Sequence, residues 1–165
     1  MANPKYNINI SSQSEDWGNI EIELFPDLAP NHCTNFDNLV SENKYDGCAF
    51  HRVIPGFMIQ GGDPNSINGD KSTWGMGNPS QKNVNAEFSD RTHSRGIISA
   101  ARAMDPNSAS SQFFIMVEDS PFLDNQYSIY GQVLNGMDIA DKIVNSPRDG
   151  GDNPNNKIEM KITRI

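Results

Sequence analysis

Eight short segments of the chain carry the residue pattern of β-strands, and this pattern limits the folds that the chain can adopt. Residues 5–11 and 19–25 alternate apolar and polar side chains, as strands with one solvent-exposed face do. The polar segment 11–18 between them suits a hairpin turn. The other candidate strands are 50–54, 57–62, 96–102, 112–117, 128–134 and 157–165.

Only two segments space their apolar residues as an amphipathic helix does. They are residues 31–43, with Asn31 as the candidate N-cap, and residues 136–144. The alternating order of helices and strands that a Rossmann fold requires is absent. The sequence therefore predicts a mainly β fold, an antiparallel sandwich or closed barrel whose open ends are covered by the two helices.

Length and charge narrow the class of protein. The 165 residues fit a single domain, residues 1–165, with enough chain to bury a core. A net charge of −8 disfavours nucleic acid and anionic lipid as partners. No basic leader precedes an apolar run, and no window approaches the about 18 apolar residues of a membrane span. We expect a monomeric, cytoplasmic protein whose two cysteines, Cys33 and Cys48, are reduced.

No motif of metal, nucleotide or nucleophilic chemistry is present. The three histidines lack the paired spacing of a zinc site, and no P-loop, Gly-rich dinucleotide turn or nucleophile elbow occurs. We therefore expect no metal and no cofactor. A serine triad assembled in space from Ser99, a histidine and an aspartate stays open as an alternative, because triads ignore sequence order.

The apolar run Phe50–Asp63, "FHRVIPGFMIQGGD", contains two long polar side chains, Arg52 and Gln60. Such side chains are rarely buried without partners. Strand alternation would place both on one face, while Val53, Ile54 and Ile59 serve the core or its rim. A forked, charged arginine among aromatic residues and methionine suits a site that binds and polarises a group without proton transfer.

The segment from 61 to about 95 is rich in Gly, Asn, Ser and Pro. Irregular segments of this length in a compact domain are usually functional. We therefore expect this segment to contribute to a site.

At these residues the sequence resembles the cyclophilins, the peptidyl-prolyl cis-trans isomerases. The run "FHRVIPGFMIQGGD" matches the family signature almost letter for letter, and Ile98–Met116, "ISAARAMDPNSASSQFFIM", matches a second block. A third block is "FLDNQYSIYGQVLNGMDIADKI". The resemblance covers effectively the whole chain. It implies an eight-stranded antiparallel β-barrel capped by two α-helices, with a packed interior and a substrate groove on its outer face.

The resemblance also implies roles for eleven residues. Arg52 is the catalytic arginine, and Gln60 and Phe57 complete the catalytic centre, with Gln60 binding the substrate backbone. The implied substrate-binding residues are Met58, Ala101, Arg102, Gln112, Phe114, Phe122, Leu123 and Tyr127. Proline-containing peptides and unfolded or partly folded proteins are the implied partners.

The chain departs from well-known family members at the groove. Phe122 stands where they carry a tryptophan associated with tight cyclosporin binding, so we expect weak cyclosporin binding. Tyr127 replaces a common histidine, which we expect to change the preference for the residue after proline. Arg102 replaces a common asparagine, a change that we expect to be mild because the family uses mainly the backbone there. The segment "NSINGDKSTWG" lacks a Gly-Gly pair often found after "GGD", so we expect a different shape of the wall near Gly69.

Three functions from different classes compete at this stage. The leading one is a prolyl isomerase. The second is a proline-peptide binding module with little turnover, which needs the pocket but not Arg52. The third is a hydrolase, which the absence of a nucleophile motif disfavours.

Overall fold

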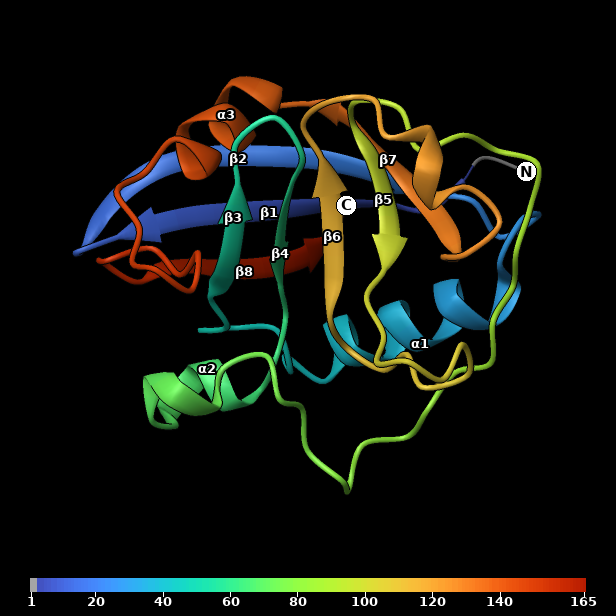
Figure 1. The fold of residues 1–165 in the computed structure, drawn as a ribbon, viewed down its shortest axis with the longest axis horizontal. Helices are drawn as coiled ribbons and strands as arrows, with labels where there is room; N and C mark the ends of the chain where they lie inside the picture. The colour runs from blue at the N-terminus through green and yellow to red at the C-terminus, as the bar shows by residue number, and fades with distance from the viewer. Residues whose placement is uncertain (1–2) are drawn as a thin grey trace.

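The computed structural model describes residues 3–165 and contains one antiparallel sheet of eight strands, curled into a nearly closed barrel (Figure 1). The strand order is β3-β4-β6-β5-β7-β2-β1-β8. The strands are β1 (Lys5–Ser12), β2 (Glu15–Leu24), β3 (Phe50–Ile54), β4 (Met58–Gly61), β5 (Ile97–Ala100), β6 (Phe113–Met116), β7 (Ile129–Asn135) and β8 (Ile158–Arg164). The predicted barrel is confirmed.

The barrel closes between its two edge strands through the residues just before β3. Ala49 forms an isolated antiparallel bridge with Glu159 of β8. The amide of Met160 donates to the Cys48 carbonyl at 2.9 Å, and the amide of Gly47 donates to the Met160 carbonyl at 3.0 Å. These bonds cover edges that would otherwise expose unpaired backbone groups.

The first hairpin is tighter than the sequence pattern predicts. Strands β1 and β2 pair as far as Ser12 and Glu15, which leaves only Gln13 and Ser14 in the turn. Both have positive φ, 53° and 65°, as the two-residue turn that matches strand twist requires. The polar segment is therefore mostly strand, because pairing across the hairpin outweighs its loop-like composition.

Helices α1 (Pro30–Ser41) and α3 (Met137–Val144) lie at opposite ends of the barrel, α3 above and α1 below in Figure 1. The prediction of Asn31 as the cap of α1 is wrong, because Ala29 is the N-cap and the helix begins at Pro30, two residues earlier than predicted. The carboxylate of Glu87 instead accepts from the amides of Asn31 and His32 at 3.2 and 2.8 Å. A distant side chain thus supplies the acceptor that a local cap would give.

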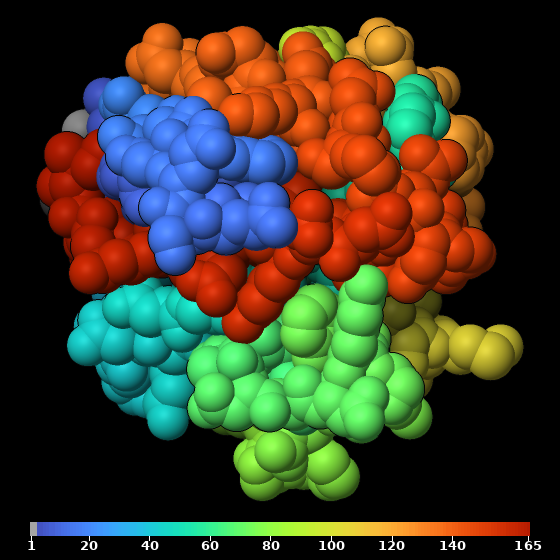
Figure 2. All heavy atoms as spheres, turned by 90° about the vertical axis from the view of Figure 1, so that its left-hand side faces the viewer, coloured from blue at the N-terminus to red at the C-terminus, as the bar shows by residue number. Residues whose placement is uncertain are grey.

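The segment between β4 and β5 contains short helical turns, α2 (Asn65–Asn68) and a 3₁₀ turn η1 (Lys71–Thr73). The stretch before β8 lies between this segment and the first hairpin (Figure 2). There the Ser12 hydroxyl donates to the Lys157 carbonyl at 2.8 Å, and the Lys71 ammonium donates to the Pro154 carbonyl at 3.1 Å.

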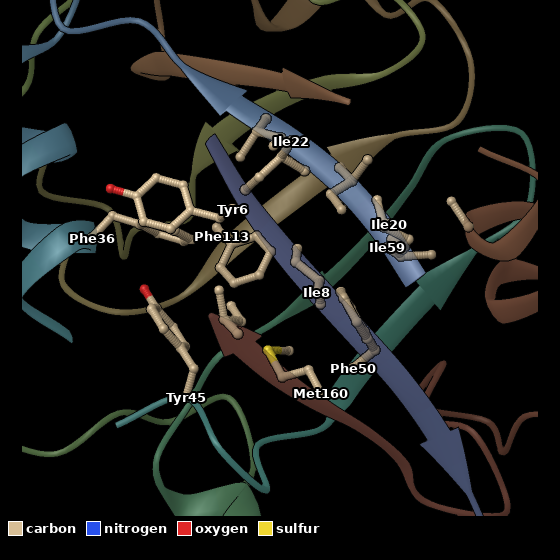
Figure 3. Packing of buried hydrophobic residues seen from close by; sticks show 14 of the residues in the cluster. Tyr6, Ile8, Ile20, Ile22, Phe36, Tyr45, Phe50, Ile59, Phe113 and Met160 are labelled. Atoms are coloured by element: carbon tan, nitrogen blue, oxygen red, sulfur yellow. The ribbon is translucent and has the colours of Figure 1, made fainter. Parts of the chain in front are cut away.

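The barrel interior is filled by one apolar cluster, the inner cluster, to which all eight strands and both longer helices contribute. Figure 3 shows its centre, where side chains from facing strands and α1 point toward one another. The labelled members are Tyr6, Ile8, Ile20, Ile22, Phe36, Tyr45, Phe50, Ile59, Phe113 and Met160. The interior is therefore a packed core, and a ligand site must lie elsewhere.

A smaller apolar cluster, the outer cluster, lies on the outside of the same strands. Its buried members are Phe25, Met58, Ile97, Ala101, Phe114, Met116, Leu123 and Ile129, with Leu28, Ile54, Phe57 and Tyr127 half-buried against them. Among residues 3–165, no helix is long and apolar enough to cross a membrane.

Candidate active site

Arg52 and Gln60 lie side by side on the outer face of the barrel. They are paired opposite each other across β3 and β4, and Gln60 is paired with Phe114 across β4 and β6. A register shift in β3 between Phe50 and Arg52 inserts one extra residue there. Arg52 therefore faces outward although Phe50, two residues earlier, faces the core.

The neighbouring apolar residues divide between the two faces. Val53 and Ile59 are fully buried in the inner cluster, as the alternation predicts. The prediction that Ile54 serves the core or its rim is wrong. Ile54 is half-buried and packs on the outer cluster, because the strand pleat returns it to the face of Arg52.

Nine of the eleven predicted site residues surround one hollow of about 120 Å³, here called the Arg52 pocket. This volume suits one small side chain, since drug-sized ligands need about 300 Å³ or more. Apolar atoms of the outer cluster form its floor, and polar groups stand at its rim. The lining residues are Arg52, Phe57, Met58, Gln60, Ala101, Arg102, Phe114, Leu123 and Tyr127.

The guanidinium of Arg52 is free to act on a ligand. The side chain is exposed, and within the described chain it makes neither a side-chain hydrogen bond nor an ion pair, unlike Arg95, whose guanidinium holds Asp141 through two bonds of 2.8 Å. A positively charged group with unused donors thus stands beside a hollow that has an apolar floor.

Gln60 is held in one orientation by a chain of amides. Its Nε2 donates to Oε1 of Gln112 at 3.1 Å, and Nε2 of Gln112 donates to the Gly75 carbonyl at 3.1 Å. The Oε1 of Gln60 has no partner among the described residues, so it can accept a hydrogen bond from a ligand.

Two predicted residues lie outside the Arg52 pocket. Gln112 lines an adjoining polar hollow of about 340 Å³, which shares Gln60, Ala101 and Arg102 with the pocket. Phe122 is 66% exposed, and its ring packs on that of Phe57 with centroids 5.7 Å apart. Phe122 therefore supports the pocket from the outside.

The irregular segment between β4 and β5 forms one wall of the adjoining hollow, in line with the expectation that it contributes to a site. The buried carboxylate of Asp63 holds this wall, accepting from the amides of Gly75 and Gly77 at 2.6 and 3.0 Å. Gly75 has a φ of +96° and packs on His51, where a Cβ would lie 2.7 Å from the imidazole Nε2. Only glycine fits this close approach.

The histidine beside Arg52 is a structural residue. His51 is buried, and burial, opposed by Asp63 and reinforced by Arg52, lowers its pKa to about 4. It is therefore neutral near pH 7 and packs under the Gly75 wall, and its buried Nδ1 has no hydrogen-bond partner among residues 3–165.

A Ser-His-Asp arrangement does exist under the pocket. His93 Nε2 lies 3.0 Å from the Ser99 hydroxyl, and His93 Nδ1 lies 2.9 Å from a carboxylate oxygen of Asp124. Ser99 and His93 are both fully buried, and the serine hydroxyl donates to the Ser128 carbonyl at 3.1 Å. No substrate carbonyl can reach this serine, so the arrangement does not support the hydrolase alternative.

The side chains that could bind a metal ion and the two cysteine thiols are the groups that metal or thiol chemistry would use. Within residues 3–165, no cluster of His, Cys, Asp and Glu side chains is arranged to hold a metal ion. Cys33 and Cys48 are buried free thiols, and burial raises the pKa of each to about 12. Neither thiol is activated as a nucleophile.

Comparison with known proteins decides the family. Residues 7–165 match the sequence family described as "Cyclophilin type peptidyl-prolyl cis-trans isomerase/CLD". The chain belongs to this cyclophilin family. A probable peptidyl-prolyl cis-trans isomerase of Brucella suis is 49% identical over 130 residues, which cover 76% of this chain and 66% of that protein. An isomerase of Schizosaccharomyces pombe is 40% identical over 143 residues, or 83% of this chain and 86% of that protein.

Solved structures show the same fold. A cyclophilin-type isomerase of Cryptosporidium parvum superimposes with a TM-score of 0.84 at 29% identity, covering 99% of this chain and 98% of that one. The structure of that protein in the presence of the dipeptide Ala-Pro gives a TM-score of 0.79 at 30% identity over 96% of this chain and 98% of that one.

Proposed function

We propose that this cyclophilin accelerates rotation about Xaa-Pro peptide bonds in exposed segments of unfolded or partly folded proteins. One observation carries the proposal: the guanidinium of Arg52, which has no side-chain hydrogen bond or ion pair within residues 3–165, stands at the rim of a pocket that has an apolar floor and the volume of a small ring. The Ala-Pro dipeptide used with the Cryptosporidium relative supports proline as the residue that enters the pocket.

The physics of bond rotation explains why such a site suffices. Amide resonance gives a barrier of about 18 to 20 kcal/mol, so uncatalysed X-Pro rotation takes about 10 to 100 s. In the twisted state resonance is broken and the proline nitrogen regains a lone pair. A donor aimed at that nitrogen stabilises the twisted state more than either planar state, which is what catalysis requires.

Each part of the site has a task in this scheme. Phe57, Met58, Phe114 and Leu123 hold the proline ring, the free Oε1 of Gln60 accepts from the substrate backbone, and Arg52 donates to the nitrogen. Millisecond turnover needs about a 10⁴-fold gain, or about 5.5 kcal/mol. One charge-assisted hydrogen bond together with a held geometry on both sides of the bond is of this size.

The test is the cis-to-trans rate of a short Ala-Pro-Phe peptide with wild type, Arg52→Ala and Arg164→Ala. Arg164 is an exposed arginine on β8, paired with Asp37 and absent from the pocket lining, so its variant controls for the loss of one positive charge. Peptide affinity is measured separately by NMR titration. We expect acceleration by wild type and Arg164→Ala, and loss of most of it in Arg52→Ala with peptide affinity within about threefold.

Two results would redirect the proposal. Peptide binding without acceleration by folded wild type would establish the proline-peptide binding module. Equal acceleration by wild type and Arg52→Ala would remove Arg52 from the mechanism.

We also propose that cyclosporin binds weakly. Phe122 offers an exposed ring without the N–H group of the tryptophan found in family members that bind it tightly. Inhibition titrations should show a weak inhibitor whose affinity improves in Phe122→Trp. Nanomolar inhibition of the wild type would contradict this proposal.

A further inference from the structure

Residues 121–127, here called the outer wall, supply Leu123 and Tyr127 to the Arg52 pocket but lie outside the sheet. The wall consists of the 3₁₀ turn η2 (Pro121–Leu123) and the irregular residues after it. Its backbone bonds within the wall are local, such as the bond from the Gln126 amide to the Leu123 carbonyl at 3.1 Å. A segment of this kind needs side chains from elsewhere to fix its position.

The first fastening comes from the residues just before β5. One oxygen of the Asp124 carboxylate accepts from the Thr92 hydroxyl at 2.5 Å. The other accepts from the amide of His93 at 2.7 Å and faces its Nδ1 at 2.9 Å. Burial opposes ionisation of Asp124, but these hydrogen bonds outweigh it and hold its pKa below the usual value.

The second fastening comes from Arg102, just after β5. Its Nε and Nη2 both donate to the Gln126 carbonyl, at 3.0 and 2.6 Å. Its Nη1 donates to the Ala103 carbonyl at 2.9 Å and to the Met104 carbonyl at 3.3 Å. The guanidinium is thus occupied, in contrast to that of Arg52, and it joins the two segments that flank the pocket.

The same guanidinium orients Tyr127. Its central carbon lies 4.5 Å from the centroid of the Tyr127 ring, a cation–π distance. The Tyr127 ring also packs edge-on against the Phe114 ring, with ring centroids 5.5 Å apart and an interplanar angle of 86°. Arg102 therefore helps to hold Tyr127 against the floor of the pocket, together with the rings of Phe114 and His93.

We propose that Arg102 is a positioning residue, which fixes the outer wall and Tyr127 so that the pocket is formed before substrate arrives. This inference rests on the proposed isomerase function and replaces a direct substrate-binding role for the Arg102 side chain. Preorganisation of this kind strengthens binding because the free protein has less conformational freedom to lose. Loss of the Arg102 side chain should therefore raise KM and weaken peptide binding, while kcat, which depends on Arg52, stays nearly unchanged.

The test compares Arg102→Ala with Arg91→Ala. Arg91, which is exposed where Arg102 is half-buried, also has its guanidinium 4.5 Å from the centroid of an aromatic ring, that of Phe25, but it does not line the pocket. We expect Arg102→Ala to raise KM and the peptide Kd about three- to tenfold with kcat within twofold, whereas Arg91→Ala leaves both constants unchanged. Arg102→Lys keeps a cation but not the fork, so it should recover only part of the loss.

A double-mutant cycle with Tyr127→Leu shows whether Arg102 acts through Tyr127. If Arg102 acts through Tyr127, the peptide Kd of the double variant should be close to that of whichever single variant has the higher Kd. Additive losses, or an Arg102→Ala variant that binds as Arg91→Ala does, would overturn it. Urea denaturation should show that Arg102→Ala remains folded, because the hydrogen bonds of Asp124 with Thr92 and His93 are still present. Inactive wild type would instead refute the proposed function, and the Kd comparison would still test Arg102.

Discussion

Two adjacent phenylalanines on β6 show how the barrel separates stability from chemistry. Phe113 points inward and meets the rings of Phe36, Tyr45 and Phe50 at 5.7 to 6.1 Å (Figure 3). Phe114 points outward, stacks on His93 at 6.1 Å and lines the Arg52 pocket. The inner ring is enclosed on all sides, whereas the outer ring belongs to a cluster that leaves one opening. One strand thus contributes to a closed core and to a binding site.

Removing the inner ring should have the largest effect on folding. Phe113→Ala leaves a cavity among three aromatic rings, so we expect it to lower the free energy of unfolding by about 3 to 5 kcal/mol. The kcat/KM per folded molecule should stay within about twofold, because the pocket is built on the other face. Urea denaturation and the isomerase rate of the folded fraction measure both quantities. A large loss of turnover with normal stability would contradict the separation.

Acid should also weaken the fold but leave the chemistry intact. The folded-state pKa of His51 is about 4, below the ordinary 6.5, so the unfolded chain binds its proton first as pH falls. Its contribution, about 3 kcal/mol at most, is therefore complete above pH 6.5 and lost as pH falls toward 4. Burial lowers the pKa values of His32 and His93 as well, so their contributions decline in the same direction.

Denaturation curves from pH 8 to pH 4 measure this dependence. His51→Asn should flatten part of it, while kcat/KM of the folded protein should stay level from pH 8 to 6 because the proposed bond rotation transfers no proton. A titration of kcat/KM near pH 6.5 would place a histidine in the mechanism.

The outer ring should give the converse of Phe113. Phe114→Ala removes the floor of the pocket, and we expect kcat/KM to fall about 10- to 100-fold through lost substrate contact. The loss of unfolding free energy should be smaller than for Phe113→Ala, because within residues 3–165 two aromatic rings pack on Phe114 and three on Phe113. Urea denaturation and the isomerase rate measure both quantities. Equal losses of stability in Phe113→Ala and Phe114→Ala would contradict the separation of stability from chemistry between the two faces.

The smallest effect should come from the rim. Gln60→Ala removes one acceptor for the substrate backbone and one bond to Gln112, so we expect kcat/KM to fall about three- to tenfold. Stability should change by about 0.5 kcal/mol or less, because Gln60 is only half-buried. Gln132→Ala is a matched control, since Gln132 is a glutamine on β7 that bonds Glu23 away from the pocket. Equal activity of the two variants would remove Gln60 from substrate binding.

Local pattern and family resemblance predicted much of this arrangement. Strand alternation separates Val53 from Arg52, and the signature blocks identified nine residues that line one pocket. The cap of α1 was not predictable in this way, because its acceptor, Glu87, lies 55 residues from His32 along the chain. The same holds for the fastening of Asp124 by His93 across 31 residues.

Arg102 shows the limit of reasoning by position. The resemblance places it beside the substrate, and it does line the pocket, but its donors are used by the Gln126 carbonyl 24 residues away. Ile54 faces outward because it lies two residues after Arg52, so the pleat returns it to the same face; its apolar side chain alone suggested the core. The local sequence pattern does not reveal contacts between side chains that are far apart along the chain.

The most direct test uses two neighbours on β3, Arg52 and Val53, which point to opposite faces. Arg52→Gln and Val53→Ala are each measured for kcat/KM of the folded protein and for the free energy of unfolding. The account predicts that Arg52→Gln loses most of its activity at unchanged stability, while Val53→Ala loses about 1 to 3 kcal/mol of stability at unchanged activity. Full activity in Arg52→Gln would contradict it.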